Sequence, residues 1–168
     1  MATAKTGAPR YRSVLLICAA NTARSVIAEH LLRRELRQRE AEGLVTVRSA
    51  GIAAYARDGA LVSLDTRMTL RDDGFPIDDE MTSTDLKRHP ELLESADLVL
   101  AMTAAQAAQL RALFPVSSSC TVRTIKEFAG ENGDIEDPVE QGHQAFTACR
   151  EELRRMAPLI ADHILKRE

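Results

Sequence analysis

Cysteine is scarce in this chain of 168 residues, which contains three cysteines, Cys18, Cys120 and Cys149. Their separations do not match the paired spacing of zinc ligands, and the four histidines show no metal-ligand spacing either. Three cysteines are also too few for a disulfide framework. We therefore expect no metal site and no cofactor, and we expect a reducing compartment, the cytoplasm.

The chain also lacks an excess of positive charge and any long apolar run. Its 22 lysines and arginines stand against 25 acidic residues, so the formal net charge is −3. This balance provides no strong attraction to nucleic acid or to an anionic membrane. Residues 1–12 lack the apolar stretch of a signal peptide, and no run reaches the length of a membrane span. We expect a flexible tail at residues 1–12, and neither nucleic acid nor membrane as a partner.

Strand and helix patterns alternate along the rest of the chain. Short apolar runs predict four strands, at residues 14–17, 44–48, 98–102 and 121–125. Helical patterns cover residues 26–36, residues 64–70 before Gly74, a segment capped by Thr103, and residues 146–164, where Pro158 predicts a kink or an interruption. This alternation predicts one domain over residues 13–168. Its fold class is α/β, a doubly wound, four-stranded parallel sheet with helices on both faces.

The segment of residues 18–25 follows the first expected strand and reads Cys-Ala-Ala-Asn-Thr-Ala-Arg-Ser. A strand that enters a helix through such a loop directs backbone N–H groups and the helix N-terminus at one anion-sized point. A cysteine there is favoured as its thiolate, and Arg24 supplies a planar fork for two phosphate oxygens. The segment predicts a phosphate-binding loop with Cys18 as the nucleophile. The alternative is a small buried cysteine at a strand end.

These residues resemble the low-molecular-weight protein tyrosine phosphatases, whose loop reads approximately C-x-G-N-x-C-R-S-P. The resemblance extends to residues 49–51 after the second expected strand, to residues 95–103 and to Asp137-Pro138. It implies that Cys18 is the nucleophile, Arg24 the phosphate clamp and Asp137 the general acid. An aspartate before proline is otherwise a common turn pairing, so the role of Asp137 depends on the resemblance.

The resemblance also implies which residues bind the substrate. They are Ala19, Ala20, Asn21, Thr22, Ala23 and Ser25 in the loop, Tyr55 as an aromatic wall, and Val139. Asn21 and Ser25 shape the loop and bond around the thiolate. Three positions depart from the family pattern, because Ala20 replaces glycine, Ala23 replaces a second cysteine and Val26 replaces proline. Ala20 fits only where its φ need not be positive, and no departure removes a group that the reaction needs.

The substrate preference depends on Thr22 and Val139. Phosphotyrosine-specific members of the family carry a bulky aliphatic residue at the place of Thr22 and aromatic residues after Asp-Pro, whereas members that act on phosphoarginine carry threonine. A small hydroxyl leaves room for a guanidinium and can bond to it, and Glu140 places a carboxylate near a cationic leaving group. We expect a cysteine-dependent phosphoprotein phosphatase that prefers phosphoarginine, with phosphotyrosine as the close alternative.

Two other functions share parts of this pattern. An arsenate reductase needs additional cysteines close together near the third strand, whereas Cys120 and Cys149 are far apart and outside that region. An inactive anion-binding module would keep the loop without turnover, and Ala20 would then mark the lost catalysis. We favour a monomeric enzyme whose partners are phosphorylated protein substrates.

Overall fold

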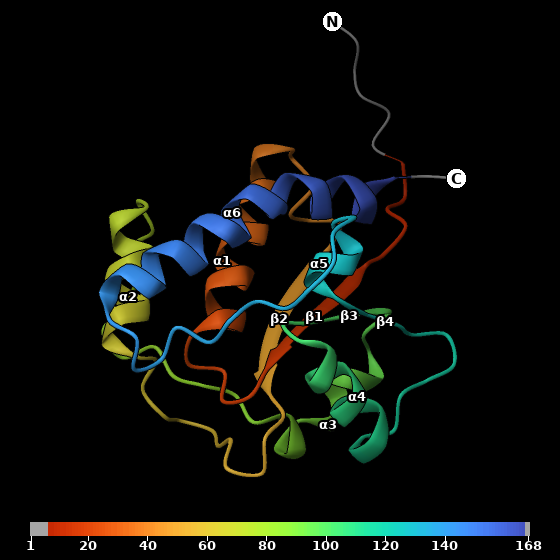
Figure 1. Ribbon diagram of the computed structural model, residues 1–168. Helices are drawn as coiled ribbons and strands as arrows, with labels where there is room; N and C mark the ends of the chain where they lie inside the picture. Colours follow the sequence, from red (N-terminus) through yellow and green to blue (C-terminus); the bar gives the residue numbers. More distant parts are fainter. Residues whose placement is uncertain (1–6, 167–168) are drawn as a thin grey trace, which may run out of the picture.

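A computed structural model describes residues 7–166 of the chain (Figure 1). The four strands β1 (Ser13–Cys18), β2 (Thr46–Gly51), β3 (Leu98–Ala101) and β4 (Thr121–Thr124) form one parallel sheet in the order β2-β1-β3-β4. The connections between strands contain the helices α1 (Arg24–Gln38), α2 (Leu64–Asp72), η1 (Leu86–Arg88), α3 (Pro90–Glu94) and α4 (Ala104–Leu113), and β4 is followed by α5 (Ile125–Phe128) and α6 (His143–Leu165). The predicted four-stranded parallel sheet is confirmed.

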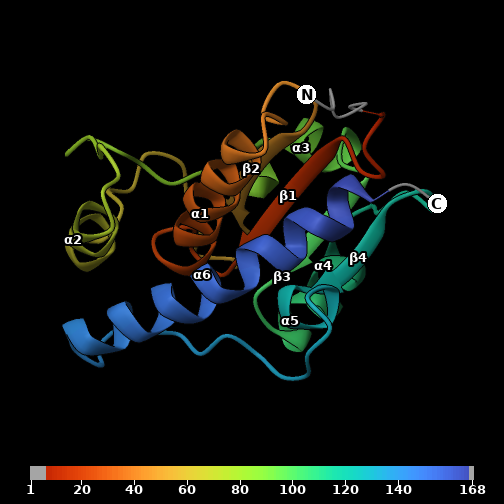
Figure 2. The same ribbon diagram turned by 90° about the horizontal axis from the view of Figure 1, so that it is seen from above.

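Helices cover both faces of the sheet, as Figures 1 and 2 show from two directions. Side chains of β1 alternate between two cores, because successive residues of a strand point to opposite faces. Val14 and Leu16 pack with α1 and α6, whereas Leu15 and Ile17 pack with α3 and α4. All four side chains are at most 1% exposed. The doubly wound fold and its helices on both faces are therefore confirmed.

The second strand differs from its predicted bounds. It begins at Thr46 rather than at residue 44, and it continues through Gly51. Its pairing with β1 runs in register from Ser13 opposite Thr46 to Cys18 opposite Gly51. Residues 49–51 therefore belong to the strand instead of following it. Apolar composition alone placed Leu44 in the strand, but that side chain is 38% exposed before the pairing begins.

Helix α6 continues through Pro158, so the expected interruption is absent. Proline lacks the N–H that would bond the carbonyl of Arg154 four residues earlier. Arg154 is exposed on the helix surface, where water can satisfy that carbonyl. The buried side chains of Met156 and Ile160, on either side of the proline, pack into the same core and keep the helix continuous.

The end of the expected N-terminal tail contacts the domain. The backbone N–H groups of Arg10 and Tyr11 both donate to the carbonyl of Ile164 near the end of α6. The Tyr11 ring packs edge-on against Phe128 at 5.8 Å between centroids. Residues 10–11 are thus attached to the fold, whereas residues 1–6 of the predicted tail lie outside the described residues.

Gly51 ends β2 where the strand meets the loop that follows β1. A Cβ at this residue would lie 2.7 Å from the carbonyl oxygen of Ala19 and 2.8 Å from the carbonyl carbon of Ala20. Both neighbours are backbone atoms, which cannot rotate away as the end of a flexible side chain can. The glycine is needed because the loop and the strand approach one another so closely.

We expect Gly51→Ala to lower the free energy of unfolding by about 1–3 kcal/mol, the usual cost of overpacking. Gly43→Ala is the matched control, because a Cβ there meets no atom within 4 Å and the residue's φ is not positive. The control should leave stability unchanged or raise it by about 0.4–1 kcal/mol. Urea unfolding measures both changes, and equal stability of the two variants would contradict the steric argument.

Candidate active site

The Cys18 thiol lies at the carboxyl end of β1, at the base of the loop formed by residues 18–24, and it is 3% exposed. The hydroxyl oxygen of Ser25 lies 2.9 Å from its Sγ. The backbone N–H of Asn21 donates to the same sulfur at 3.3 Å. A backbone N–H donor and a hydroxyl that is able to donate therefore meet at one sulfur, an arrangement that suits a nucleophile.

Asn21 holds the loop in shape. Its backbone is left-handed, with φ 59°, a conformation that asparagine tolerates better than most residues. Its buried amide nitrogen donates to the hydroxyls of Ser25 at 2.8 Å and Ser49 at 2.9 Å. Its amide oxygen accepts from the backbone N–H of Thr84 at 2.9 Å. Sequence reasoning gave no role to Ser49 or Thr84, although the motif of residues 49–51 contained the signal for Ser49.

The departure at Ala20 is compatible with this loop. Among the described residues, the non-glycine positions with positive φ are Asn21, Glu40 and Glu140. Asn21, not Ala20, therefore takes the left-handed conformation, and the expected condition on Ala20 is met.

The N-terminus of α1 faces the same loop without a side-chain cap. The N-cap residue is Ala23, which makes no side-chain cap bond, and the first turn contains no acidic residue. By contrast, Ser63 and Thr103 cap α2 and α4 through their hydroxyl oxygens, as predicted for Thr103. The first N–H groups of α1 are therefore not occupied by a capping oxygen, and they can bind an anion.

Arg24 connects the loop to the segment of residues 129–142. It is 7% exposed, and one guanidinium nitrogen donates to the carbonyl of Ile135 at 2.9 Å. Another guanidinium nitrogen lies 3.6 Å from a carboxylate oxygen of Asp137. The Asp137 side chain is half-exposed, and its other oxygen accepts from the N–H of Val139 at 3.1 Å. The segment between α5 and α6 thus brings Asp137 to Arg24.

One hollow of about 180 Å³ collects the expected site residues. It is lined by Cys18, Ala19, Ala20, Thr22, Ala23, Arg24, Tyr55, Asp137 and Val139. Asn21 and Ser25 do not line it, since their side chains bond beneath the loop. Larger hollows of about 440 and 370 Å³ lie along α1 and β2, and neither contains a cysteine. Another hollow of about 250 Å³ is lined by Cys149 and Asp137, but not by Arg24. The smallest of these hollows is the candidate active site because it holds the thiol, the guanidinium and the carboxylate together.

The walls of this pocket come from three separate segments. The side chains of Tyr55 and Val139 are 73% and 43% exposed and stand at its mouth. Thr22 is half-buried, and its carbonyl accepts from the N–H of Ser63 and from the hydroxyl of Thr66. The start of α2 thereby fixes the backbone of Thr22, whose side chain lines the pocket.

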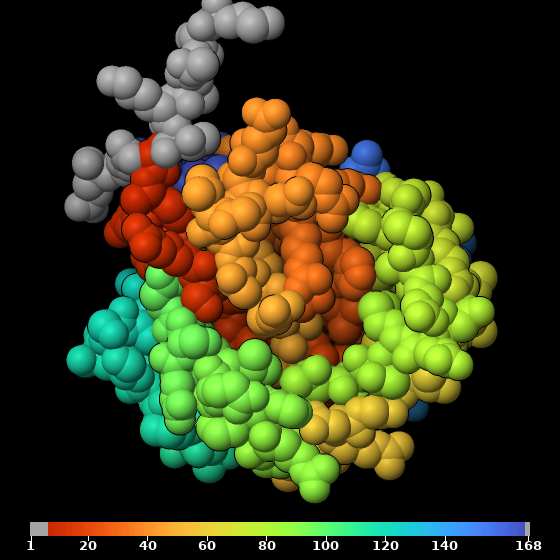
Figure 3. All heavy atoms as spheres, turned by 180° about the vertical axis from the view of Figure 1, so that it is seen from behind, coloured from red at the N-terminus to blue at the C-terminus, as the bar shows by residue number. Residues whose placement is uncertain are grey.

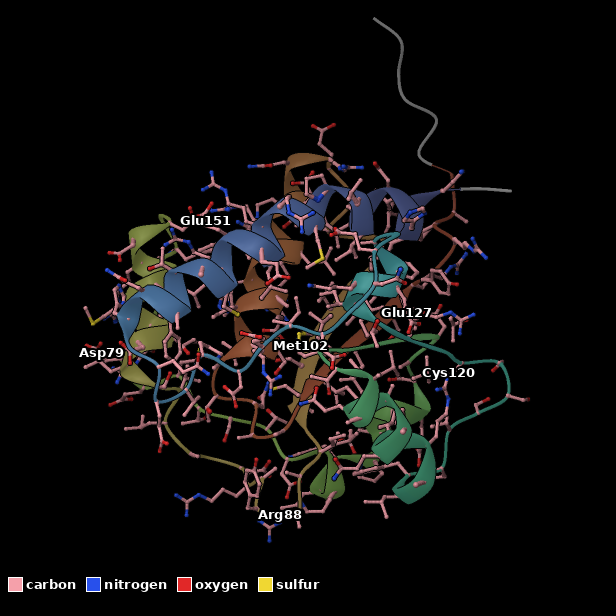
Figure 4. The ribbon with its side chains drawn as sticks, viewed as in Figure 1. Asp79, Arg88, Met102, Cys120, Glu127 and Glu151 are labelled. Carbon is pink, nitrogen blue, oxygen red and sulfur yellow. The ribbon has the colours of Figure 1, made fainter. Side chains whose placement is uncertain are left out.

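The other two cysteines are not poised to react. Cys149 is buried in α6, and burial raises the pKa of its thiol to about 12. Cys120 is half-buried just before β4, toward the right in Figure 4, and burial together with Asp97 raises its pKa. Both thiols therefore stay protonated near neutral pH. Cys149 lies in one core, and Cys120 packs against the other.

Among residues 7–166, no three or more His, Cys, Asp or Glu side chains are grouped so that they could hold a metal ion. Within the same part of the chain, no helix is both long and apolar enough to cross a membrane.

This chain is similar to known proteins over most of its length. The family model described as low molecular weight phosphotyrosine protein phosphatase matches residues 13–168. A protein-arginine-phosphatase of Geobacillus stearothermophilus is 32% identical over 152 residues, which are 90% of this chain and 95% of that protein. The arginine phosphatase structure from the same organism superposes with a TM-score of 0.75 at 33% identity, covering 90% and 91% of the two chains. The structure of a low molecular weight protein tyrosine phosphatase from T. tengcongensis superposes with a TM-score of 0.78 at 28% identity, and the match covers 90% of this chain and 98% of that one.

We expect peroxide to carry Cys18 beyond the sulfenic acid to forms that thiols do not restore. The sulfenic acid needs a nearby thiol to form a disulfide, but Ala23 offers none and the thiols of Cys120 and Cys149 are protonated. The matched variant Ala23→Cys puts a thiol into the lining of the same pocket. Mass spectrometry after peroxide should find sulfinic acid at Cys18 in the parent and a disulfide in the variant. A disulfide from Cys18 to Cys120 or Cys149 in the parent would contradict this.

Proposed function

Because this chain belongs to the low molecular weight phosphotyrosine protein phosphatase family, whose members are hydrolases, we propose that it dephosphorylates proteins through a phosphocysteine on Cys18. The observation that carries the proposal is the meeting of Cys18, Arg24 and Asp137 in one pocket of about 180 Å³. An anion at this point faces a guanidinium and the uncapped N-terminus of α1.

In the first step, the Cys18 thiolate attacks phosphorus, the S–P bond forms and the bond to the leaving group breaks. The fork of Arg24 and the backbone N–H groups of the loop stabilise the charge on the equatorial oxygens. The carbonyl of Ile135, at 2.9 Å from Arg24, holds the guanidinium in place before substrate arrives. Apart from Cys18, the loop therefore contributes by positioning the phosphoryl group and stabilising its negative charge.

Asp137 serves both steps as acid and then as base. It protonates the departing nitrogen or oxygen, and it then takes a proton from the water that attacks the phosphocysteine. The S–P bond breaks, inorganic phosphate leaves and the thiolate is restored. The 3.6 Å contact with Arg24 and the bond from Val139 keep the carboxylate over the pocket.

Phosphoarginine is the preferred substrate in this proposal. Thr22 lines the pocket with a short hydroxyl-bearing side chain, which leaves room for a planar guanidinium and can accept its hydrogen bonds. Val139, which lines the same pocket, supplies no aromatic surface for a phenyl ring. A relative with 32% identity bears the name protein-arginine-phosphatase, which supports the same choice.

Phosphotyrosine is the second candidate. Tyr55 is an aromatic side chain at the pocket mouth, and a phenyl ring can pack against it. The T. tengcongensis relative is named a protein tyrosine phosphatase. Arsenate reduction is disfavoured, because the raised pKa values of Cys120 and Cys149 do not suit a thiol relay.

The deciding experiment compares kcat/KM for phosphoarginine and phosphotyrosine peptides of the same sequence. Cys18→Ser is the control, because a hydroxyl is a far weaker nucleophile at neutral pH and should abolish turnover while the loop still binds an oxyanion. Substantial turnover by that variant would remove Cys18 from the mechanism. An enzyme that hydrolyses neither peptide would be left as an anion-binding module.

We expect Asp137→Ala to slow turnover by about 100- to 10,000-fold for substrates with poor leaving groups, the usual range for a lost general acid. Activated aryl phosphates need little protonation, so their turnover should change little. Steady-state kinetics with both substrate types measures the difference. An equal loss on both would assign the acid to another residue, and Glu136→Ala is then the matched variant to compare.

We expect Thr22→Ile to shift the preference from phosphoarginine toward phosphotyrosine. The added hydrocarbon gives an aromatic ring a surface, and it leaves a guanidinium without its polar contact. One unmatched polar contact costs about 1–3 kcal/mol, which corresponds to about a ten- to hundredfold change in the ratio of kcat/KM values. Thr22→Ser, which keeps the hydroxyl, should leave the ratio near that of the parent. If Thr22→Ile also leaves it unchanged, Thr22 does not select the substrate.

A further inference from the structure

Tyr55 stands at the tip of a tight turn in the segment of residues 52–61. The N–H of Ala56 donates to the carbonyl of Ala53 at 3.0 Å and closes the turn. Ala53 and Ala56 are buried, whereas Tyr55 between them is exposed. The N–H of Ala53 also donates to the carbonyl of Ala19 in the phosphate loop at 3.0 Å. The base of the turn is therefore joined to the active site, and its tip forms the pocket mouth.

The ammonium group of Lys87 binds both ends of this turn. Its Nζ donates to the carbonyl of Ala53 at 2.6 Å and to the carbonyl of Ala56 at 3.3 Å, and it lies 2.9 Å from an oxygen of Asp85. An ammonium has three N–H groups; two of them bond these two carbonyls, and its charge is paired with Asp85. In Figure 3 the surface near residue 60 lies against that of residues 80–90, and Figure 4 labels Arg88, next to Lys87, at the same end of the molecule.

Asp85 fixes the lysine in turn. Its carboxylate is buried, so it requires a cation, and its Oδ1 also accepts from the backbone N–H of Lys87 at 3.0 Å. The N–H of Asp85 donates to Asp58 at 2.7 Å, and the other carboxylate oxygen of Asp58 lies 2.7 Å from His89. This hydrogen bond raises the pKa of His89. The segment that carries Tyr55 is thus held at both the turn and Asp58.

We propose that Lys87 is a positioning residue for the substrate, because its ammonium fixes the turn that presents Tyr55 at the mouth of the pocket. Lys87 does not line the pocket itself, so it acts through the carbonyls of Ala53 and Ala56. By fixing the turn, Lys87 raises the affinity for the phosphoprotein segment around the reacting group, and this part of the inference rests on the proposed function. The rigidity of the turn is a property of the protein alone and does not depend on that function.

The first test measures the turn directly by ¹⁵N relaxation of the amides of residues 54–56. In the parent their order parameters should be near the rigid value of about 0.85, and in Lys87→Met they should fall toward about 0.6. Lys87→Arg keeps a charge beside Asp85 but replaces the compact ammonium with a planar guanidinium, so an intermediate value is expected. If Lys87→Met does not fold, Lys87→Arg provides the same test.

Arg34→Met is the matched control. Its guanidinium also bonds a backbone carbonyl and a carboxylate, both of Asp73, at 2.9 and 2.6 Å, and these lie at the end of α2 rather than at the turn. Its removal should leave the order parameters of residues 54–56 unchanged. Unchanged order parameters in both Lys87 variants, or an equal fall in the control, would overturn the proposal.

The second test is a double-mutant cycle with Tyr55→Ala. Lys87→Met should raise KM for a phosphopeptide by about three- to tenfold, while kcat and the KM of a small aryl phosphate change less than about twofold. In the Tyr55→Ala background, Lys87→Met should raise KM no further. An equal rise in both backgrounds would overturn the assignment to Tyr55. Failure of the parent to hydrolyse any phosphopeptide would refute the proposed function, while the order parameters still decide the role of Lys87.

Discussion

The buried, left-handed Asn21 is the constraint on which the geometry of the pocket depends. A buried amide is costly unless its donors and acceptor are paired, and here its bonds reach Ser25 on α1, Ser49 on β2 and the backbone of Thr84. These partners come from three separate segments of the chain, namely helix α1, strand β2 and the segment between α2 and η1. The loop therefore takes its shape when the sheet assembles, before any anion binds, and its N–H groups need little reorganisation.

The segment that carries Asp137 is attached to the end of the sheet and to Arg24 through the backbone of Ile135. The N–H of Ile135 donates to the carbonyl of Met102 just beyond β3, and the carbonyl of Ile135 accepts from Arg24. Figure 4 labels Met102 near the centre of the molecule, where this loop crosses the end of the sheet. Parallel strands end at one common edge, so residues more than 100 positions apart in the chain meet there.

Several cationic side chains in this molecule bond backbone carbonyls of irregular segments. Arg24 binds that of Ile135, Arg34 that of Asp73 and Lys87 those of the Tyr55 turn. Each carbonyl belongs to an irregular segment that lacks sheet or helix partners for it. A formal net charge of −3 is therefore compatible with an anion pocket, because the local positive potential comes from Arg24 and from backbone N–H groups.

The sequence by itself determined the strand–helix alternation, the loop from Cys18 to Ser25 and the capping of α4 by Thr103, because these features depend on neighbours within a few residues. It placed the start of β2 too early, since strand bounds depend on pairing with β1. Of the two outcomes that it expected at Pro158, a kink or an interruption, the interruption is absent because packing keeps the helix whole. Only the tertiary structure decided that Asn21 rather than Ala20 is left-handed, that Ser49 and Thr84 hold it, and that Lys87 reaches the Tyr55 turn. Those contacts join segments distant in the chain, and no local pattern encodes the distance between them.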